Sequence, residues 1–411
     1  MSTPPAPPRT LISAGQLLTG PAGEQIPDGA VLFEGDTIAA VGSRVDLETQ
    51  AGPDATRRAF SADHTLMPGL INAHVHLAFD TSPDPVTTLR QADDITLAME
   101  MADHARQLLS AGITTARDLG DRNGLAVKVR DAITAGRIPG PRILAATAPL
   151  TTPGGHCWFL GGEVDGETAI RDRIRRNIDA GADLIKVMAS GGQMTSGTAG
   201  MAQSQFGAKE LHIIVDEAHQ AGVKVAAHAH ATQSIIDAAA AGVDTIEHCT
   251  WRGPDGIDQR ADTAQQIAEK GIFVCTGSTG DWERLASIIG TERTDQLLGR
   301  VRWLADHGVR LIAGTDAGLP GSVFTDIVGA LQIYQRYGFS PAHILELVTV
   351  NPAEALGLTD HTGQLRAGLS ADILVIHGNP LTDLTALRNI ELVATRGRLS
   401  DGSASRSSTS V

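Results

Sequence analysis

Four histidines, a lysine and an aspartate lie near the ends of short apolar segments, and together they could hold metal ions. These residues are His74, His76, Lys186, His228, His248 and Asp316. His74 and His76 are two positions apart, so on a strand both side chains would point to one face and could bind one ion. Each residue alone could be a structural hydrogen-bonding group, and Asp316 could cap a helix. The set as a whole predicts a metal site, because clustered polar groups are costly without an ion.

The segments that carry these residues alternate with helix-like stretches through the middle of the chain. Aliphatic strand candidates cover residues 66–76, 112–120, 142–150, 184–192, 224–230, 244–249, 272–277 and 310–318. Eight strand–helix units predict an α/β fold, a (β/α)₈ TIM barrel, in which the carboxyl ends of the strands open onto one mouth. An open doubly wound sheet is the competing fold, but no G-x-G-x-x-G motif follows an early strand.

The two ends of the chain differ in character from the middle. Residues 10–65 and 362–399 contain short β-like pieces separated by Gly, Pro and Asp turns. We therefore expect both ends to build one small β-sandwich domain, with the barrel formed by residues 66–361. The Pro-rich residues 1–9 and the polar residues 400–411 are expected to be disordered.

Composition limits the partners that the chain could have. Its net charge is −14 without a basic cluster, which argues against nucleic acid or an anionic membrane. No apolar run approaches the roughly 18–20 residues that span a bilayer, and the N-terminus lacks the pattern of a secretory signal. Cys157, Cys249 and Cys275 show no paired spacing, which fits a reducing compartment. We expect a cytoplasmic protein with a small-molecule substrate, and a homo-oligomer is left open.

Several motifs resemble the amidohydrolase superfamily. They are MPGLINAHVHL, GITTARDLG, DLIKVMASGG, AAHAH, TIEHC, AGTDAG and NPAEALGL, followed by G-x-L-x-x-G-x-x-A-D-I-L-V. Within the superfamily, the chain is most similar to the imidazolonepropionase-like branch, which includes Xaa-Pro dipeptidases (prolidases) and related metal-dependent carboxypeptidases. The resemblance covers nearly the whole chain, including both ends.

The resemblance implies a binuclear metal site. His74, His76 and Asp316 match the residues that bind the more buried metal. His228 and His248 match the ligands of the second metal. Zinc is the ion that we expect in both positions, given imidazole and carboxylate ligands.

The resemblance also implies roles for Lys186 and Asp316. Lys186 matches a lysine that carbon dioxide carboxylates, so that its carbamate and a hydroxide would bridge the two metals. The hydroxide would attack the substrate carbonyl. Asp316 would take the proton of the hydroxide and deliver it to the leaving nitrogen, as the general acid/base.

Loop residues are candidates for substrate binding. His156 matches a loop histidine that resembles substrate- or oxyanion-contacting groups in the branch, and Trp158 could line an apolar pocket. His230 shares the face of His228. In dipeptidases of the branch this position is often a tyrosine that contacts the substrate carboxylate, so the histidine is a departure.

The expected function is hydrolysis of an amide-type C–N bond in a small substrate, such as an N-acyl amino acid or a Xaa-Pro-like dipeptide. Hydrolysis of a cyclic amide, a carbamate or urea, or an ester or lactone on the same site is the alternative. Arg252 and Arg117 are candidates to clasp a free carboxylate, which would favour the peptide-like substrates. A mononuclear deaminase is disfavoured by Lys186, and an inactive scaffold by the complete ligand set.

Overall fold

The fold is α/β with mixed sheets, as a computed structural model shows for residues 8–21, 24–195, 199–277 and 280–401. The contacts between Cα atoms divide the chain into two compact units. The first contains the described residues of Met1–Ile71, Arg106–Thr115 and Ser340–Val411, and the second those of Asn72–Ala105 and Ala116–Phe339. Among the described residues, no helix combines the length and the apolar character that a membrane crossing requires.

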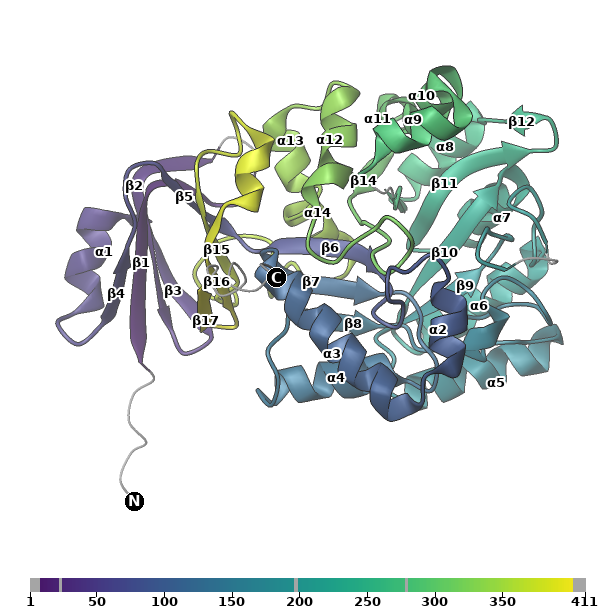
Figure 1. Cartoon of the computed structure of the whole chain (residues 1–411), viewed down its shortest axis with the longest axis horizontal. Coiled ribbons are helices and arrows are strands. Elements are labelled where there is room, and N and C mark those ends of the chain that lie inside the picture. The colour runs from purple at the N-terminus through teal and green to yellow at the C-terminus, as the bar shows by residue number, and fades with distance from the viewer. Residues whose placement is uncertain (1–7, 22–23, 196–198, 278–279, 402–411) are drawn as a thin grey trace, which may run out of the picture. The chain divides into compact units, whose positions relative to one another are not determined.

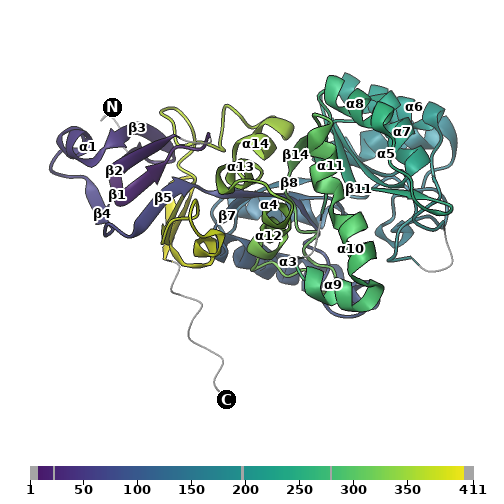
Figure 2. The same ribbon diagram turned by 90° about the horizontal axis from the view of Figure 1, so that it is seen from above.

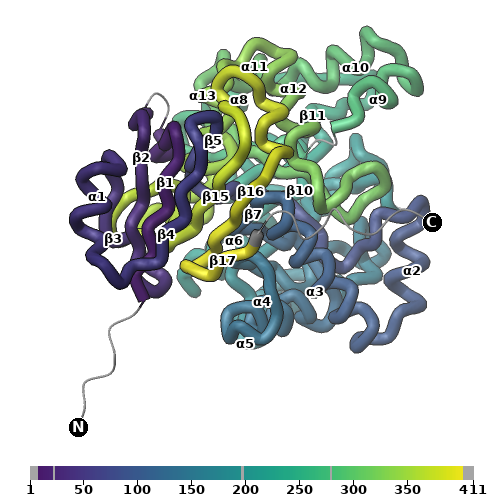
Figure 3. The backbone as a smooth tube through the Cα atoms, turned by 60° about the vertical axis from the view of Figure 1, so that its left-hand side comes forward, coloured from purple at the N-terminus to yellow at the C-terminus, as the bar shows by residue number. Residues whose placement is uncertain are grey.

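An eight-stranded sheet built from both ends of the chain forms the centre of the first unit (Figure 1). Its strands are β1 (Arg9–Leu18), β2 (Gln25–Glu34), β3 (Thr37–Ser43), β4 (Thr56–Ala59), β5 (His64–Pro68), β15 (Ile373–His377), β16 (Ile390–Thr395) and β17 (Arg398–Asp401). β15 lies antiparallel to β5, and this pairing joins the two ends (Figure 3). The expected disordered ends lie mostly outside the described residues, although β1 already begins at Arg9 and β17 ends at Asp401.

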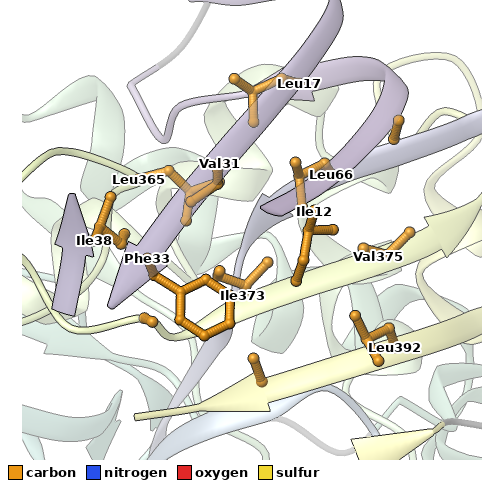
Figure 4. Packing of buried hydrophobic residues seen from close by; sticks show 13 residues of the cluster. Ile12, Leu17, Val31, Phe33, Ile38, Leu66, Leu365, Ile373, Val375 and Leu392 are labelled. Atoms are coloured by element: carbon orange, nitrogen blue, oxygen red, sulfur yellow. The ribbon is translucent and has the colours of Figure 1, made fainter. Parts of the chain in front are cut away.

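One face of this sheet holds an apolar core to which both ends contribute (Figure 4). Its larger members are Ile12, Leu17, Val31, Phe33, Ile38, Leu66, Leu365, Ile373, Val375 and Leu392. On the other face, helix α1 (Arg44–Ala51) packs through Leu47 and Ala51 against Leu11 and Leu32. The side chains of alternate residues in β1 and β2 therefore point to opposite faces of the sheet, as the two-residue period of a strand requires. The unit also contains η2 (Leu384–Arg388), α13 (Pro341–Glu346) and α14 (Val350–Ala355).

Each of the eight predicted apolar segments of the middle contains a strand. They are β6 (Leu70–Val75), β7 (Ile113–Asp118), β8 (Arg142–Ala145), β9 (Leu184–Met188), β10 (Lys224–Ala231), β11 (Thr245–Gly253), β13 (Phe273–Cys275) and β14 (Arg310–Ile312). One sheet has the order β14-β13-β11-β10-β9 with parallel pairing, and β12 (Gly256–Ile257) adds to β11 as an antiparallel hairpin. The other sheet has the order β6-β7-β8.

Two isolated parallel bridges link the ends of these two sheets. Leu150, beyond β8, pairs with Val187 of β9, and Val75 of β6 pairs with Ala317, beyond β14. Every residue of β6, β7 and β9 is buried. Burial on both faces is typical of parallel strands covered by helices, and it explains why these segments are aliphatic runs without alternation.

Helices connect the eight strands of the middle of the chain. They are α2 (Pro85–Gln91), α3 (Asp94–Ser110), α4 (Leu125–Thr134), η1 (Trp158–Leu160), α5 (Gly166–Asp179), α6 (Ala208–Gln220), α7 (Thr232–Ala241), α8 (Ala261–Glu269), α9 (Trp282–Ile289), α10 (Thr291–Leu298), α11 (Arg300–Asp306) and α12 (Val328–Arg336). α5 packs against α6, α6 against α7, and α7 against α8 (Figure 2). In α6 the buried Leu211, Ile214 and Val215 recur at helical spacing, as expected of an amphipathic helix that covers a sheet.

Candidate functional site

The structure brings the six predicted metal-binding residues together, some within strands and some just beyond the carboxyl ends of strands. His74 lies on β6 and His76 just beyond it, Lys186 on β9, His228 on β10, His248 on β11, and Asp316 beyond β14. In the cluster of His74, His76 and Asp316, one ligand atom from each residue lies within 4.8 Å of the others. The same holds for a second cluster, which contains His228, His248 and also His230.

The first cluster has the chemistry that a metal ion would need. Nε2 of His74 is 3.1 Å from Oδ1 of Asp316, and Nε2 of His76 is 3.4 Å from the same oxygen. His74 Nε2 and Asp316 Oδ1 are both buried, and neither has an aligned hydrogen-bond partner among the described residues. Burial alone would raise the pKa of Asp316, but the nearby His74 lowers it well below its usual range. Two unsatisfied ligand atoms that face each other fit a bound cation.

The second cluster consists of three imidazoles in mutual contact. The ring centroids of His228 and His248 are 4.7 Å apart, and those of His230 and His248 also lie 4.7 Å apart with the rings stacked. Burial, together with the neighbouring His230, holds the pKa of both His228 and His248 well below the usual range. They are therefore neutral, which is the form in which histidine binds a metal.

Lys186 contributes an amine to the cavity that members of both clusters line. Its side chain is buried and lines the same cavity as His76, His228, His248 and Asp316. Burial is the main cause that lowers the pKa of Lys186, while the carboxylate of Glu247 opposes it. Lowering of this pKa favours the uncharged amine, which is the nucleophilic form of lysine.

Glu247 is a site residue that the sequence interpretation missed. Its Oε2 is 2.8 Å from Nδ1 of His74, and its Oε1 accepts hydrogen bonds from Arg117 and Thr245 at 2.7 and 2.6 Å. Burial raises the pKa of Glu247, but the Arg117 charge and the His74 hydrogen bond outweigh burial and lower it. The sequence contained one signal for a role of Glu247 in the site. Glu247 directly precedes His248, and carboxylates often orient metal-binding histidines.

Arg117 is not available to bind a substrate carboxylate, contrary to the sequence-based expectation. The side chain is buried, and it donates to Ala73 O at 2.7 Å, to Thr245 Oγ1 at 2.9 Å and to Glu247. It does not line the cavity. Because β7 is covered on both faces, its arginine is enclosed between strands instead of reaching the mouth.

The clusters open into a cavity of about 550 Å³ within the second unit. Its apolar lining includes Phe79, Met188, Met194, Leu285, Leu297 and Leu298. His156 and His230 also line it, and both are buried. Burial lowers the pKa of His156 to about 4 and that of His230 to about 3, so both imidazoles are neutral near pH 7. Neutral imidazoles can donate or accept hydrogen bonds to a substrate.

The structure does not place Trp158 in the lining of this cavity, although the sequence suggested that role. Trp158 is 36% exposed and faces Arg90, whose guanidinium carbon is 5.7 Å from the ring centroid. The preceding Cys157 has a left-handed backbone, φ 57°, and lines the cavity itself. The turn at Cys157 therefore places the neighbouring tryptophan outside. Burial raises the pKa of the Cys157 thiol to about 12, so it is not a nucleophile near neutrality.

Two arginines that line the cavity are Arg252 and Arg300. Arg300 was not expected from the sequence, because it lies on α11, far in the chain from the ligand motifs. Its guanidinium donates to His248 O at 3.0 Å, to Leu297 O at 2.5 Å and to Thr276 O at 3.0 Å. It thus supports the backbone of a predicted metal ligand.

Comparison with known proteins agrees with the resemblance to the amidohydrolase superfamily. The amidohydrolase family model matches residues 65–399. Ochratoxinase from Aspergillus niger is 28% identical over 93% of this chain and 84% of its own length, and its crystal structure matches with a TM-score of 0.82. A Xaa-Pro dipeptidase crystallised with methionine in its active site matches with a TM-score of 0.84 and 26% identity, over 96% of this chain and 100% of that one. Imidazolonepropionase from Haloarcula marismortui is 24% identical over 88% of both chains.

Proposed function

The chain belongs to the amidohydrolase family and is a hydrolase of C–N bonds, and we propose that it cleaves an amide bond of a small substrate with two metal ions. The observation that carries the proposal is the pair of neighbouring ligand clusters beside one cavity, with His74 Nε2 and Asp316 Oδ1 buried and unsatisfied. The relatives support the type of bond, because a Xaa-Pro dipeptidase is named for cleaving a peptide amide.

We further propose that the eight strands of the middle close into a (β/α)₈ barrel of residues 66–361. The support is the order of the two sheets together with the bridges Leu150–Val187 and Val75–Ala317, which link the sheet ends in a ring. For residues 10–65 and 362–399 we propose a β-sandwich, supported by the core that both chain ends share.

His74, His76 and Asp316 would hold one ion, and His228 and His248 the other, with zinc in both positions. Neutral imidazoles and a carboxylate form the ligand set that zinc prefers. When bound, two such ions supply an activated water for attack and polarise the scissile carbonyl. Asp316 would accept the proton of the attacking water and pass it to the leaving nitrogen, and its lowered pKa keeps the carboxylate deprotonated near pH 7.

Lys186 would bear a carbamate that joins the two ligand clusters. Its amine would attack carbon dioxide, a C–N bond would form, and one proton would be released. Support comes from its burial beside two proposed cation sites, where an ammonium group would be repelled. A carbamate would instead offer two anionic oxygens to the ions.

The substrate would be a small molecule, and His156 and His230 would contact it in the cavity. The volume of about 550 Å³ is in the range of small-molecule sites. The net charge of −14 supports this choice over nucleic acid or a membrane. A reducing compartment, the cytoplasm, is proposed from the three buried free cysteines.

Metal analysis combined with a substrate panel tests the proposal. The zinc-loaded protein is analysed for metal and assayed on dipeptides, N-acyl amino acids, lactones and aryl carbamates. We expect two ions per chain and cleavage of the amides. His228→Gln should lose one of the ions, whereas the exposed His219→Gln should keep both. A single ion in the unaltered chain would contradict the binuclear site, and turnover of lactones or carbamates alone would contradict amide hydrolysis.

A further inference from the structure

We infer that Arg252 binds a free carboxylate of the substrate and thereby selects N-acyl amino acids or dipeptides over neutral amides. This inference rests on the proposed amide hydrolysis and adds to it the substrate class and the residue that sets it.

Arg252 brings a guanidinium group to the cavity without a protein partner among the described residues. It lines the cavity, and its Nε atom is buried with no hydrogen-bond acceptor. The described acidic residues of the lining are Asp84 and Asp316. Asp84 caps helix α2 by accepting from Thr87 N at 3.1 Å, and Asp316 belongs to the first ligand cluster. A partly buried guanidinium without a counter-charge is costly, and a bound carboxylate would remove that cost.

The backbone of β11 is distorted in a way that controls the position of Arg252. His228 pairs with Glu247 and Ala229 with His248, but Ala231 pairs with Arg252, so β11 contains two extra residues in this interval. His248, Cys249 and Trp251 in the same interval have left-handed backbones, with φ of 67°, 49° and 53°. Non-glycine residues rarely adopt this conformation, and such strain is concentrated at functional sites.

The distorted segment, residues 248–252 of β11, is held in place by burial of Trp251 and by hydrogen bonds to the residues that follow. Trp251 is fully buried, and Trp251 O accepts a hydrogen bond from Asp258 N at 2.7 Å. Arg252 itself pairs with Ile257 of β12 in a short hairpin. The arginine therefore starts from a fixed backbone, which limits the entropy that its side chain would lose on binding.

Other cavity residues complement a carboxylate at Arg252. His230 lines the same cavity as Arg252, and its Nδ1 is 2.9 Å from Thr250 Oγ1. Arg300 adds a second positive charge to the lining. The apolar residues Met188, Leu285 and Leu297 line the same cavity and would suit an apolar side chain. The geometry thus fits an amino acid with an apolar side chain as the carboxylate-bearing part of the substrate.

The test compares two substrates that differ only in the carboxylate, N-benzoyl-L-phenylalanine and N-benzoylphenethylamine. The zinc-loaded Arg252→Gln and Arg252→Lys variants are assayed on both. The control is Arg260→Gln, which removes a nearby exposed arginine that does not line the cavity. For Arg252→Gln we expect roughly a 10- to 100-fold loss in kcat/KM on the acid, mostly in KM, and little change on the neutral amide. Arg252→Lys should be intermediate, because it keeps the charge but loses the bidentate geometry.

An equal loss on both substrates, or no loss on the acid, would overturn the role of Arg252. A binding measurement separates this result from failure of the proposed function. Calorimetry of the zinc-loaded protein with L-phenylalanine and with phenethylamine needs no turnover. If neither substrate is cleaved but Arg252→Gln weakens only L-phenylalanine binding, the carboxylate role stands and amide hydrolysis falls. If the variant and the unaltered protein bind L-phenylalanine equally well, the inference is wrong.

Discussion

A buried carboxylate, Glu247, connects one predicted metal ligand to an arginine. Glu247 and His74 are both fully buried and 2.8 Å apart, and Arg117 balances the negative charge at 2.7 Å. The contact at Nδ1 leaves Nε2 of His74 directed at Asp316. A contact of this kind fixes the tautomer and the orientation of a metal-binding histidine.

Replacing Glu247 with glutamine should therefore weaken both the metal site and the fold. Removal of the charge leaves Arg117 buried without its counter-ion, which we expect to cost about 3–5 kcal/mol of unfolding free energy. The zinc affinity should fall roughly 10- to 100-fold. Urea unfolding and zinc titration against a competing chelator measure the two effects. Glu217→Gln, on a surface ion pair with Arg171, is the control and should retain full zinc affinity.

If Lys186 bears the proposed carbamate, Lys186→Ala should lose most activity and one of the two proposed ions, because the carbamate could no longer form. Added acetate or propionate should restore part of the activity by supplying a carboxylate in its place. Metal analysis and an activity assay with and without the acid check this. Lys128→Ala, at an exposed position on α4, should behave as the unaltered chain. Full metal content and activity in Lys186→Ala would rule out the bridging role.

At the scale of elements, strand β11 contributes more residues to the site than the sequence motifs predicted. It carries Thr245 and Glu247 in its regular part, then His248 and Arg252 in its distorted part. The regular part is anchored to β10 at its start by Asp244, whose Oδ2 accepts from Val225 N at 2.8 Å and whose Oδ1 accepts from Lys224 Nζ at 3.1 Å.

Asp244 should make the stability of this anchor depend on pH. Burial raises the pKa of Asp244, but hydrogen bonds from His219 and Val225 N and the charge of Lys224 outweigh it and lower the pKa below 3.8. Because the folded state has the lower pKa, the stabilisation is present above about pH 4 and is lost as the pH falls through the folded-state value. We expect Asp244→Asn to cost about 1–2 kcal/mol at pH 7, given its partial exposure.

Urea unfolding of both proteins between pH 3 and pH 7 tests this dependence. The difference in unfolding free energy should be largest near neutrality and should shrink towards pH 3. Asp216→Asn on helix α6 serves as the control for a carboxylate without this anchor. A difference that stays constant over the whole range would show that the charge of Asp244 is not responsible.

At the scale of the whole molecule, the proposed metals join residues that are remote in the chain. The ligands span His74 to Asp316 and come from β6, β10, β11 and the segment beyond β14. Ions that bind only the folded state stabilise it by mass action, by about 2.7 kcal/mol when free metal is 100-fold above the Kd. Removal of zinc by a chelator should therefore lower the melting temperature of the full chain.

Differential scanning calorimetry with and without the chelator measures this change, and renewed addition of zinc should reverse it. The control is His228→Gln, in which one proposed site is already impaired, so its melting temperature should respond less. Identical melting temperatures for the unaltered protein with and without zinc would contradict a metal that links these strands.

The sequence predicted the strands, and the candidate ligands on or just beyond them, from local patterns. Parallel strands covered on both faces need aliphatic runs, and all eight runs contain a strand. The two-residue spacing of His74 and His76 predicted that both contribute to one cluster. The β-like composition of both ends likewise predicted β-structure there, and both ends contribute strands to the eight-stranded sheet.

Tertiary structure alone decided which side chains reach the cavity. Arg117 and Arg252 both looked available in the sequence, yet Arg117 is enclosed with Glu247 while Arg252 lines the cavity. Trp158 lies outside and Arg300 inside because of a left-handed turn at Cys157 and the position of α11. Periodicity fixes the face on which a residue lies, but exposure depends on what packs against that face. That packing brings together residues distant in the chain, so no local pattern contains it.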